Sequence, residues 1–296
     1  MKDLYLIDAS IYVFRAWFSL PDTLTGEKGQ PVNAVYGFIR FLIEFLERTQ
    51  ASHVALAFDE SLSTSFRNEM FPEYKANRDP APPELKAQFE ACKRFAIASG
   101  CACFSHERYE ADDLIATLAA RMREAGFRNY VVTADKDLAQ VIEENDMWWD
   151  FHRNQTLSHS GVKEKFGVSP EQLRDYFGLV GDAVDNIPGV PGIGPKSATK
   201  LLWLFKDLEG IYDNIDQVAQ MAMRGAARVS TSLREHKDQA FLCRELATVK
   251  RDIPLQVGGE QLRRSEPDWV ELSGLVAELG RGEGYVQRLR SLIPST

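Results

Sequence analysis

Three short apolar segments decide the fold: LYLID at residues 4–8, HVALAFD at 53–59 and YVVTAD at 130–135. Each has the composition of a buried β-strand, and each ends in an aspartate. Between these segments, apolar residues recur at helical spacing over 32–49, 85–99 and 112–125. Strands that alternate with helices predict an α/β fold, a mostly parallel twisted sheet covered by helices on both faces.

The second half of the chain has a different pattern. CACFS (101–105) and MWWDF (147–151) complete the strand-like runs of the first half, and helical patterns dominate from about residue 169. The helical segments are 169–181, 195–206 and one long helix around 231–250, and LQVGG (255–259) is a later strand-like run. We therefore expect an α/β domain over 1–168 and a helical domain over 169–255. The sequence does not decide the role of the extension 256–296, which fits a mobile tail, a partner-binding segment or a small packed addition.

The composition restricts the class of protein. The chain has 296 residues, 44% of them hydrophobic, which is enough for a sizeable core. Its four cysteines form no CxxC pair, which predicts reduced thiols and a cytoplasmic protein. The N-terminal segment carries Asp3 and Asp8, unlike a signal peptide, and no run reaches the roughly 18 apolar residues of a membrane span. A formal net charge of -8 argues against nucleic acid unless the acids are concentrated in a metal site.

The acidic residues do fall in a pattern. The carboxyl ends of parallel strands meet at one edge of a sheet, so Asp8, Asp59 and Asp135 should lie together there. A single aspartate at a strand end is equally well explained as a helix cap, but repeated acids are not. Converging carboxylates repel one another and need a cation. The candidates are Asp8, Asp59, Glu110, Asp112, Asp113, Asp135, Asp137, Asp182 and Asp185.

The chemistry of these ligands points to the metal. Oxygen donors without histidine or thiolate favour Mg²⁺, with Mn²⁺ as a substitute, over zinc. Two such ions about 4 Å apart suit hydrolysis of a phosphodiester. A phosphatase that forms an aspartyl phosphate would need a second acid shortly after Asp8, and Ala9-Ser10 supplies none.

Five motifs in order resemble the 5′-nuclease family, which includes flap endonucleases and the 5′–3′ exonuclease domain of bacterial DNA polymerase I. They are IDASIY, FDE with SFRNEMFPEYKANR, YEADDLIATLA, VTADKDLAQ and GDAVDNIPGVPGIGPKSATKLL, and the similarity covers residues 1 to about 255. The resemblance implies a PIN-like core with a helix–three-turn–helix domain. It also implies two Mg²⁺ ions and hydrolysis of DNA at 5′ ends, flaps or nicks, in replication and repair, by a two-metal mechanism.

The resemblance also distributes the site residues. It implies that the candidate acids up to Asp137 are metal ligands of the α/β domain and that Asp182 and Asp185 are contributed by the helical domain. The chain would act as a stand-alone monomer, with any DNA polymerase as a separate partner. Two other classes stay open: a PIN-like ribonuclease, and a DNA-structure binder without catalysis.

The glycine-rich segment at 189–197 predicts a contact with duplex DNA. Pro195 stands where a nucleotide-binding P-loop would carry its lysine, and the segment lies among helices. A helix–hairpin–helix turn, whose glycines let the backbone approach a phosphate, fits better than a purely structural turn. The family's version often binds K⁺. The predicted contacts are Gly189, Val190, Gly192, Ile193, Gly194, Lys196 and Ser197.

The irregular, proline-containing segment 60–84 gathers basic and aromatic residues. It predicts a platform for a frayed DNA end, or else a solvated loop with one aromatic residue in the core. The resemblance matches about 60–95 to an arch over the active site, poorly ordered without DNA. Lys75 and Arg78 would then contact the scissile phosphate, and Tyr74 would stack on a base. Arg67 and Arg15 are further predicted DNA contacts, whereas Trp148 and Trp149 are predicted core residues.

Overall fold

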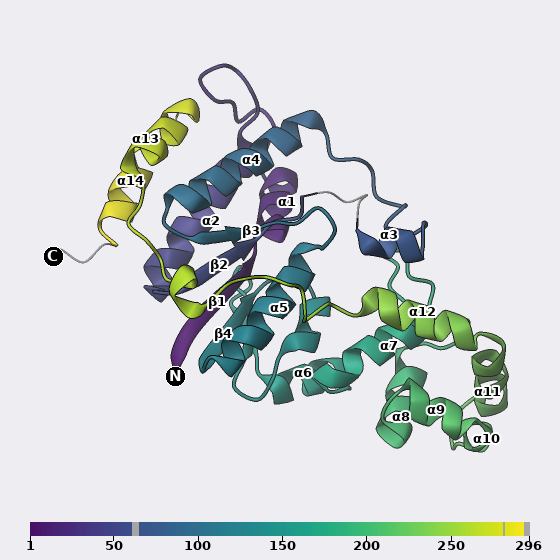
Figure 1. The fold of residues 1–296 in the computed structure, drawn as a ribbon. Helices are drawn as coiled ribbons and strands as arrows, with labels where there is room; N and C mark the ends of the chain where they lie inside the picture. Colours follow the sequence, from purple (N-terminus) through teal and green to yellow (C-terminus); the bar gives the residue numbers. More distant parts are fainter. Residues whose placement is uncertain (61–64, 281, 293–296) are drawn as a thin grey trace.

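The computed structural model describes residues 1–60, 65–280 and 282–292, and its centre is a six-stranded sheet (Figure 1). The strand order is β3-β2-β1-β4-β5-β6, and all neighbouring pairs are parallel except β5 and β6. The strands are β1 (Lys2–Asp8), β2 (Val54–Ala57), β3 (Ala102–Phe104), β4 (Phe127–Val132), β5 (Met147–Asp150) and β6 (Gln155–Leu157). The predicted fold class is confirmed, with β6 as a strand that the sequence pattern did not indicate.

Alternating strand residues build a core on each face of the sheet. On β1, Leu4 and Leu6 belong to one core and Ile7 to the other. Helix α5 (Ala111–Glu124) covers the first face, while α1 (Ala9–Ser19), α2 (Asn33–Thr49) and α4 (Pro83–Ala98) cover the second. Trp148 and Trp149 are buried, one in each core, which confirms the prediction that both are packing residues.

The second half is helical and continues the core of the α5 face. Its elements are α6 (His159–Phe166), η2 (Pro170–Gln172), α7 (Leu173–Val180), α8 (Pro195–Phe205), α9 (Leu208–Asp213), α10 (Ile215–Val218), α11 (Ala226–Glu235) and α12 (Lys237–Ala247). The prediction of one long helix around 231–250 is wrong. His236, at φ -118° and ψ 30°, separates α11 from α12. Its ring Nδ1 and its backbone N–H both lie within hydrogen-bond distance of the Ser232 carbonyl, and this contact closes α11.

The C-terminal extension is a packed addition to the α/β half. Helices α13 (Trp269–Glu278) and α14 (Glu283–Arg290) lie beside α2 and α4 (Figure 1). Backbone bonds lead the chain there, for example from Ser265 N to Gly100 O at 2.9 Å. Leu272 and Leu289 are buried in the second core. The prediction of a strand at 255–259 is wrong, because these residues form no strand and the short helix η3 (Gly259–Leu262) begins at its end.

The predicted arch is only partly irregular. Residues 61–64 lie outside the described part of the chain, and α3 (Phe66–Met70) follows them. Turns lead from α3 through Tyr74 and Lys75 to the exposed residues 76–80, and α4 begins at Pro83. Helix α4 therefore takes in the last part of the 60–95 segment. Among the described residues, no helix is both long and apolar enough to span a membrane.

Candidate active site

The strand-end aspartates lie together at the carboxyl edge of the sheet. Asp8 ends β1, which lies between β2 and β4, so Asp59 and Asp135 flank it on either side. Asp8 caps α1 by accepting a hydrogen bond from the Ile11 N–H at 3.3 Å, and its other oxygen accepts one from the Thr133 hydroxyl at 2.9 Å. Burial and then the charges of Asp59 and Asp135 raise the pKa of Asp8 to about 7. The capping role and the clustering that the sequence predicted therefore coexist.

Asp112 and Asp137 add to the same negative cluster. Burial raises the pKa of Asp112, and the charges of Asp135 and Asp8 raise it further. Asp137, at the start of η1 (Asp137–Val141), also has a raised pKa, through burial and then the charge of Asp135. In the described part of the chain, the buried Oδ1 of Asp137 has no hydrogen-bond partner.

Glu110 differs because it is neutralised by basic neighbours. The Lys75 Nζ lies 2.6 Å from its Oε2, and Arg67 lies 3.9 Å away. Burial alone would raise the pKa of Glu110, but the charges of Lys75 and Arg67 outweigh it and lower the pKa to about 2. Glu110 is therefore ionised at neutral pH, and the Lys75 ammonium supplies a positive charge that this buried carboxylate requires.

Asp113 has no free oxygen. Two nitrogens of the Arg67 guanidinium donate to its two oxygens, both at 2.8 Å, and the Lys250 N–H donates to Oδ1. The Glu110 N–H donates to Oδ2 and completes a capping box at the start of α5. The predicted role of Asp113 as a metal ligand stays a prediction that this geometry opposes.

The predicted contact of Arg67 with DNA stays a prediction that its burial opposes. Its side chain is 3% exposed. Besides Asp113, it donates to the carbonyls of Leu246 at 2.8 Å and Thr248 at 2.9 Å, at the end of α12. Arg67 thus joins α3, α5 and the helical half. The sequence carries no signal for this, because the partners lie far along the chain.

Tyr74 is also buried, which opposes its predicted stacking on a base. It is 3% exposed, and its hydroxyl donates to Glu110 at 3.2 Å and Asp185 at 3.1 Å. The alternative interpretation, one aromatic residue of the loop in the core, describes its position. Lys75 and Arg78 remain at the site: Lys75 N–H donates to the Asp185 carbonyl, and Arg78 Nη2 lies 2.5 Å from the Asp185 carboxylate.

The helical half brings Asp182 and Asp185, through a tight loop, to the acidic rim, the carboxyl edge of the sheet where Asp8, Asp112, Asp135 and Asp137 lie. Asp182 and Ile187 exchange two backbone hydrogen bonds of 2.8 Å. Gly181 has φ +73°, and a Cβ there would lie 2.4 Å from the Ile187 carbonyl oxygen, so the turn requires glycine. The Lys136 ammonium lies 2.5 Å from Asp182 Oδ2. Lys136 was not among the predicted site residues, although its position between Asp135 and Asp137 could have indicated it.

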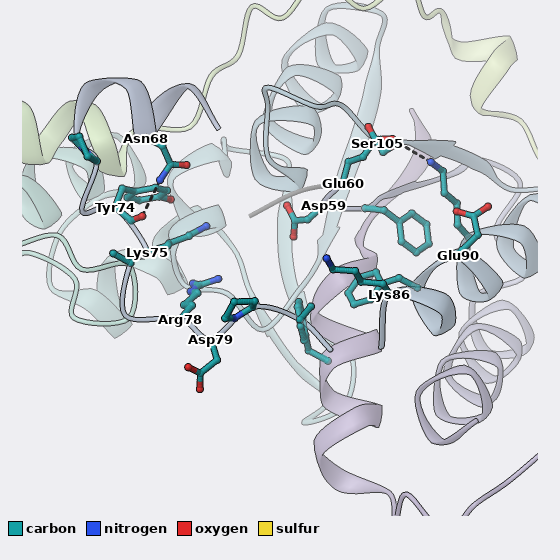
Figure 2. A pocket seen from close by; sticks show the side chains of 18 residues that line it. Asp59, Glu60, Asn68, Tyr74, Lys75, Arg78, Asp79, Lys86, Glu90 and Ser105 are labelled. Carbon is teal, nitrogen blue, oxygen red and sulfur yellow. Dashed lines mark hydrogen bonds between the residues drawn. The ribbon is translucent and has the colours of Figure 1, made fainter. Parts of the chain in front are cut away.

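A cleft opens beside Asp59, with a volume of about 730 Å³ (Figure 2). Figure 2 shows Tyr74, Lys75 and Arg78 on one side of this cleft and Asp59, Lys86 and Glu90 on the other. The lining also includes the aromatic residues Phe14, Phe58 and Phe89 and the α4 cation Lys93. Basic and aromatic groups thus line an open space beside Asp59.

The glycine-rich turn is divided into a buried and an exposed part. Val190 and Ile193 are core residues, and both backbone N–H groups donate within the protein, so the geometry opposes their predicted DNA contacts. Gly189 packs against Gly181, since a Cβ on it would lie 2.4 Å from the Gly181 nitrogen. The exposed or half-buried remainder is Gly192, Gly194, Lys196, Ser197 and, on α1, Arg15.

The carboxylates do not form a ready-made coordination sphere. Within the described ranges, no three His, Cys, Asp or Glu side chains are arranged to hold a metal ion. The acids are near enough to raise one another's pKa, yet Glu110, Asp185 and Asp182 are turned to Lys75, Arg78 and Lys136. The site therefore has two parts. Asp8, Asp112, Asp135 and Asp137 form a cluster without a paired lysine or arginine in the described part of the chain, whereas Glu110, Asp182 and Asp185 are paired with the lysines and the arginine named above.

Comparison with known proteins assigns the chain to a family. Residues 3–167 match the model of the 5′-3′ exonuclease N-terminal resolvase-like domain, and residues 168–270 match that of the 5′-3′ exonuclease C-terminal SAM fold. The chain is 32% identical over 275 residues to the 5′-3′ exonuclease of Buchnera aphidicola subsp. Schizaphis graminum, covering 93% of this chain and 96% of that protein. It is 37% identical to the DNA polymerase I of Bacillus caldotenax over 98% of this chain, but spans only 32% of that polymerase.

The fold has a counterpart among solved structures. The T5 5′-exonuclease with bound zinc aligns over 98% of both chains, with a TM-score of 0.67 and 19% sequence identity. This likeness concerns the fold alone. The two family models together cover most of the sequence, and the exonuclease relative matches over nearly its whole length. The chain therefore belongs to the 5′-3′ exonuclease family.

Proposed function

We propose that this chain is a divalent-metal-dependent 5′–3′ exonuclease and flap endonuclease, which hydrolyses DNA phosphodiesters near 5′ ends, flaps or nicks. The observation that carries the proposal is the meeting of carboxylates from both halves at one sheet edge, beside a basic and aromatic cleft. Such an edge is where α/β folds bind ligands. The family membership supports the same reaction.

The residues of the rim fit a divalent cation. The buried Oδ1 of Asp137, which has no partner among the residues that the structure describes, and the raised pKa values of Asp8 and Asp112 are what a carboxylate cluster would show if a cation completes it. All donors are oxygens, which favours Mg²⁺. Asp8, Asp112, Asp135 and Asp137 would hold the metal, with Asp59, Glu110, Asp182 and Asp185 around them. When bound, two such ions supply charge neutralisation at the phosphodiester and an activated water, the two-metal chemistry of phosphoryl hydrolysis.

Lys75 acts as a cation in this proposal and does not accept a proton. Burial lowers its pKa, but the charges of Glu110 and Asp185 outweigh this effect and raise it above the usual lysine value. The ammonium therefore stays charged at neutral pH. With Arg78, whose side chain is 33% exposed, it can offset the negative charge that develops on the phosphate.

DNA would be held on two surfaces. The cleft beside Asp59, with Lys86, Lys93 and Phe89 on α4, suits a frayed single strand, because a basic groove with aromatic rings tracks such a strand. The exposed Gly192, Gly194 and Lys196 suit the phosphates of the duplex, with K⁺ as a further predicted ligand there. A DNA polymerase partner, a monomeric state and a cytoplasmic location complete the proposal.

The test is cleavage of a 5′-labelled flap duplex. Wild type should give product with Mg²⁺ and none with EDTA, and Asp112→Asn should be inactive while the exposed Asp22→Asn is unaffected. Intact duplex binding without any metal-dependent product would leave a DNA-structure binder. Faster cleavage of single-stranded RNA than of the flap would favour the ribonuclease.

A further inference from the structure

Lys136 occupies an unusual position between the two halves of the site. It lies between Asp135 and Asp137 in the loop after β4, and its ammonium reaches Asp182 on the helical half. The distance from Nζ to Asp182 Oδ2 is 2.5 Å, and the Asp182 side chain is only 6% exposed. The lysine side chain itself is 40% exposed. The buried carboxylate of Asp182 is thus neutralised by the ammonium of a lysine that is itself partly exposed to solvent.

The loop that carries Lys136 is fixed on both sides. Asp135 N–H donates to the Thr133 hydroxyl and Asp137 N–H donates to Asp135 Oδ1, both at 2.9 Å. The Trp148 indole N–H donates to the Asp135 carbonyl at 2.8 Å. The lysine ammonium also lies 5.1 Å from the centre of the Phe177 ring on α7. The direction of the side chain is therefore a property of the fold.

The pairing uses the one oxygen of Asp182 that the loop leaves open. Asp182 Oδ1 accepts the Val184 N–H at 2.8 Å, within its own turn. Lys136 takes Oδ2, while the neighbouring Asp137 Oδ1 has no partner among the described residues. A positive charge is thus placed where the acids of the two halves meet, and it contacts the carboxylate that a divalent cation at this junction would need.

We propose that Lys136 is a positioning residue: an internal counter-cation that holds Asp182 against the rim in the metal-free protein and competes with divalent cations for Asp182 Oδ2. The inference rests on the proposed function, because it assumes that the rim binds such cations. Metal binding then requires the ammonium to give up Asp182, which weakens the apparent affinity. The same exchange explains how acids on two halves of the chain stay together before a metal arrives.

The test measures metal binding without DNA. The full chain is titrated with Mn²⁺ by isothermal titration calorimetry, as wild type, Lys136→Met, Lys136→Gln and Lys136→Arg. Removing a positive charge near a divalent cation should tighten binding roughly five- to tenfold in the Met and Gln variants. Lys136→Arg keeps the charge and should bind as wild type. Lys163→Met, at an exposed lysine of α6, removes the same charge elsewhere and should change nothing.

A second measurement separates positioning from simple charge. Without metal, Lys136→Met should unfold at a lower temperature than wild type, and saturating Mn²⁺ should abolish the difference. Lys136→Gln can still donate a hydrogen bond to Asp182, so it keeps the protein folded if the Met variant does not. Unchanged or weaker Mn²⁺ binding in both neutral variants would overturn the inference. If wild type itself binds no Mn²⁺, the metal-dependent function fails first.

Discussion

Replacing Asp8 by asparagine should stabilise the metal-free protein at alkaline pH, although it removes a residue of the candidate metal site. Asp8 is 5% exposed and faces the charges of Asp59 and Asp135. Asparagine has nearly the same shape. Its oxygen can still accept the Ile11 N–H that starts α1.

The magnitude follows from the pKa of Asp8, raised from 3.8 to about 7 by burial and by its acidic neighbours. A carboxyl group with a higher pKa in the folded state favours folding below the unfolded pKa, and that contribution is lost as pH rises through the folded pKa. Each pKa unit is worth about 1.4 kcal/mol, so ionised Asp8 costs the metal-free fold about 4 kcal/mol at pH 8. Mispairing of the new amide with Thr133 removes roughly 1 kcal/mol of the gain.

We therefore expect Asp8→Asn to raise the free energy of unfolding by about 3 kcal/mol at pH 8 in EDTA, and to have no stabilising effect at pH 4. Urea unfolding at both pH values measures this. Asp22→Asn, at an exposed position, is the matched control and should show no pH-dependent difference. Added Mg²⁺ should stabilise wild type and leave the variant nearly unchanged. A variant that is less stable than wild type at pH 8, or a gain that is the same at pH 4, would refute this electrostatic account.

Three further predictions concern the Arg67–Asp113 ion pair, the packing of α13 and the predicted duplex-binding surface. Arg67→Met should lower the free energy of unfolding by about 3–5 kcal/mol because it leaves Asp113 buried without its positively charged partner. Arg67→Lys should not restore the loss, since lysine lacks the forked geometry of the guanidinium. Urea unfolding measures both variants, and a neutral effect would contradict the structure. Leu272→Ala should lower the free energy of unfolding by about 2–5 kcal/mol in the same assay if α13 belongs to the core. Val270→Ala, at a residue that is 85% exposed, should have no measurable effect. Equal, small effects of both variants would mean that α13 does not contribute to the stability of the core. Lys196→Ala should weaken duplex binding and reduce the slope of log affinity against log salt concentration by about 1. Fluorescence anisotropy over a series of salt concentrations measures this slope. An unchanged slope would mean that Lys196 does not contact the DNA phosphates.

Much of the fold could be predicted because its signals are local. The apolar runs that end at Asp8, Asp59 and Asp135 and the helical periodicity between them fix a parallel sheet, and a parallel sheet brings its strand ends to one edge. The errors lie where a local pattern was ambiguous. Nothing in the apolar spacing around 231–250 revealed that His236 leaves the helical conformation.

The sequence by itself thus determined the α/β class, the acidic rim and the family resemblance, since each depends on residue types at short or ordered spacing. Only the tertiary structure decided how the site residues divide their roles. Arg67 is a buried joint and Tyr74 a buried hydrogen-bond donor because their partners lie on α5 and in the helical half, up to 179 residues away for Arg67 and Leu246. Lys136 and Asp182, 46 residues apart, meet for the same reason. Side-chain burial and pairing follow from packing between distant segments, which a spacing pattern does not encode.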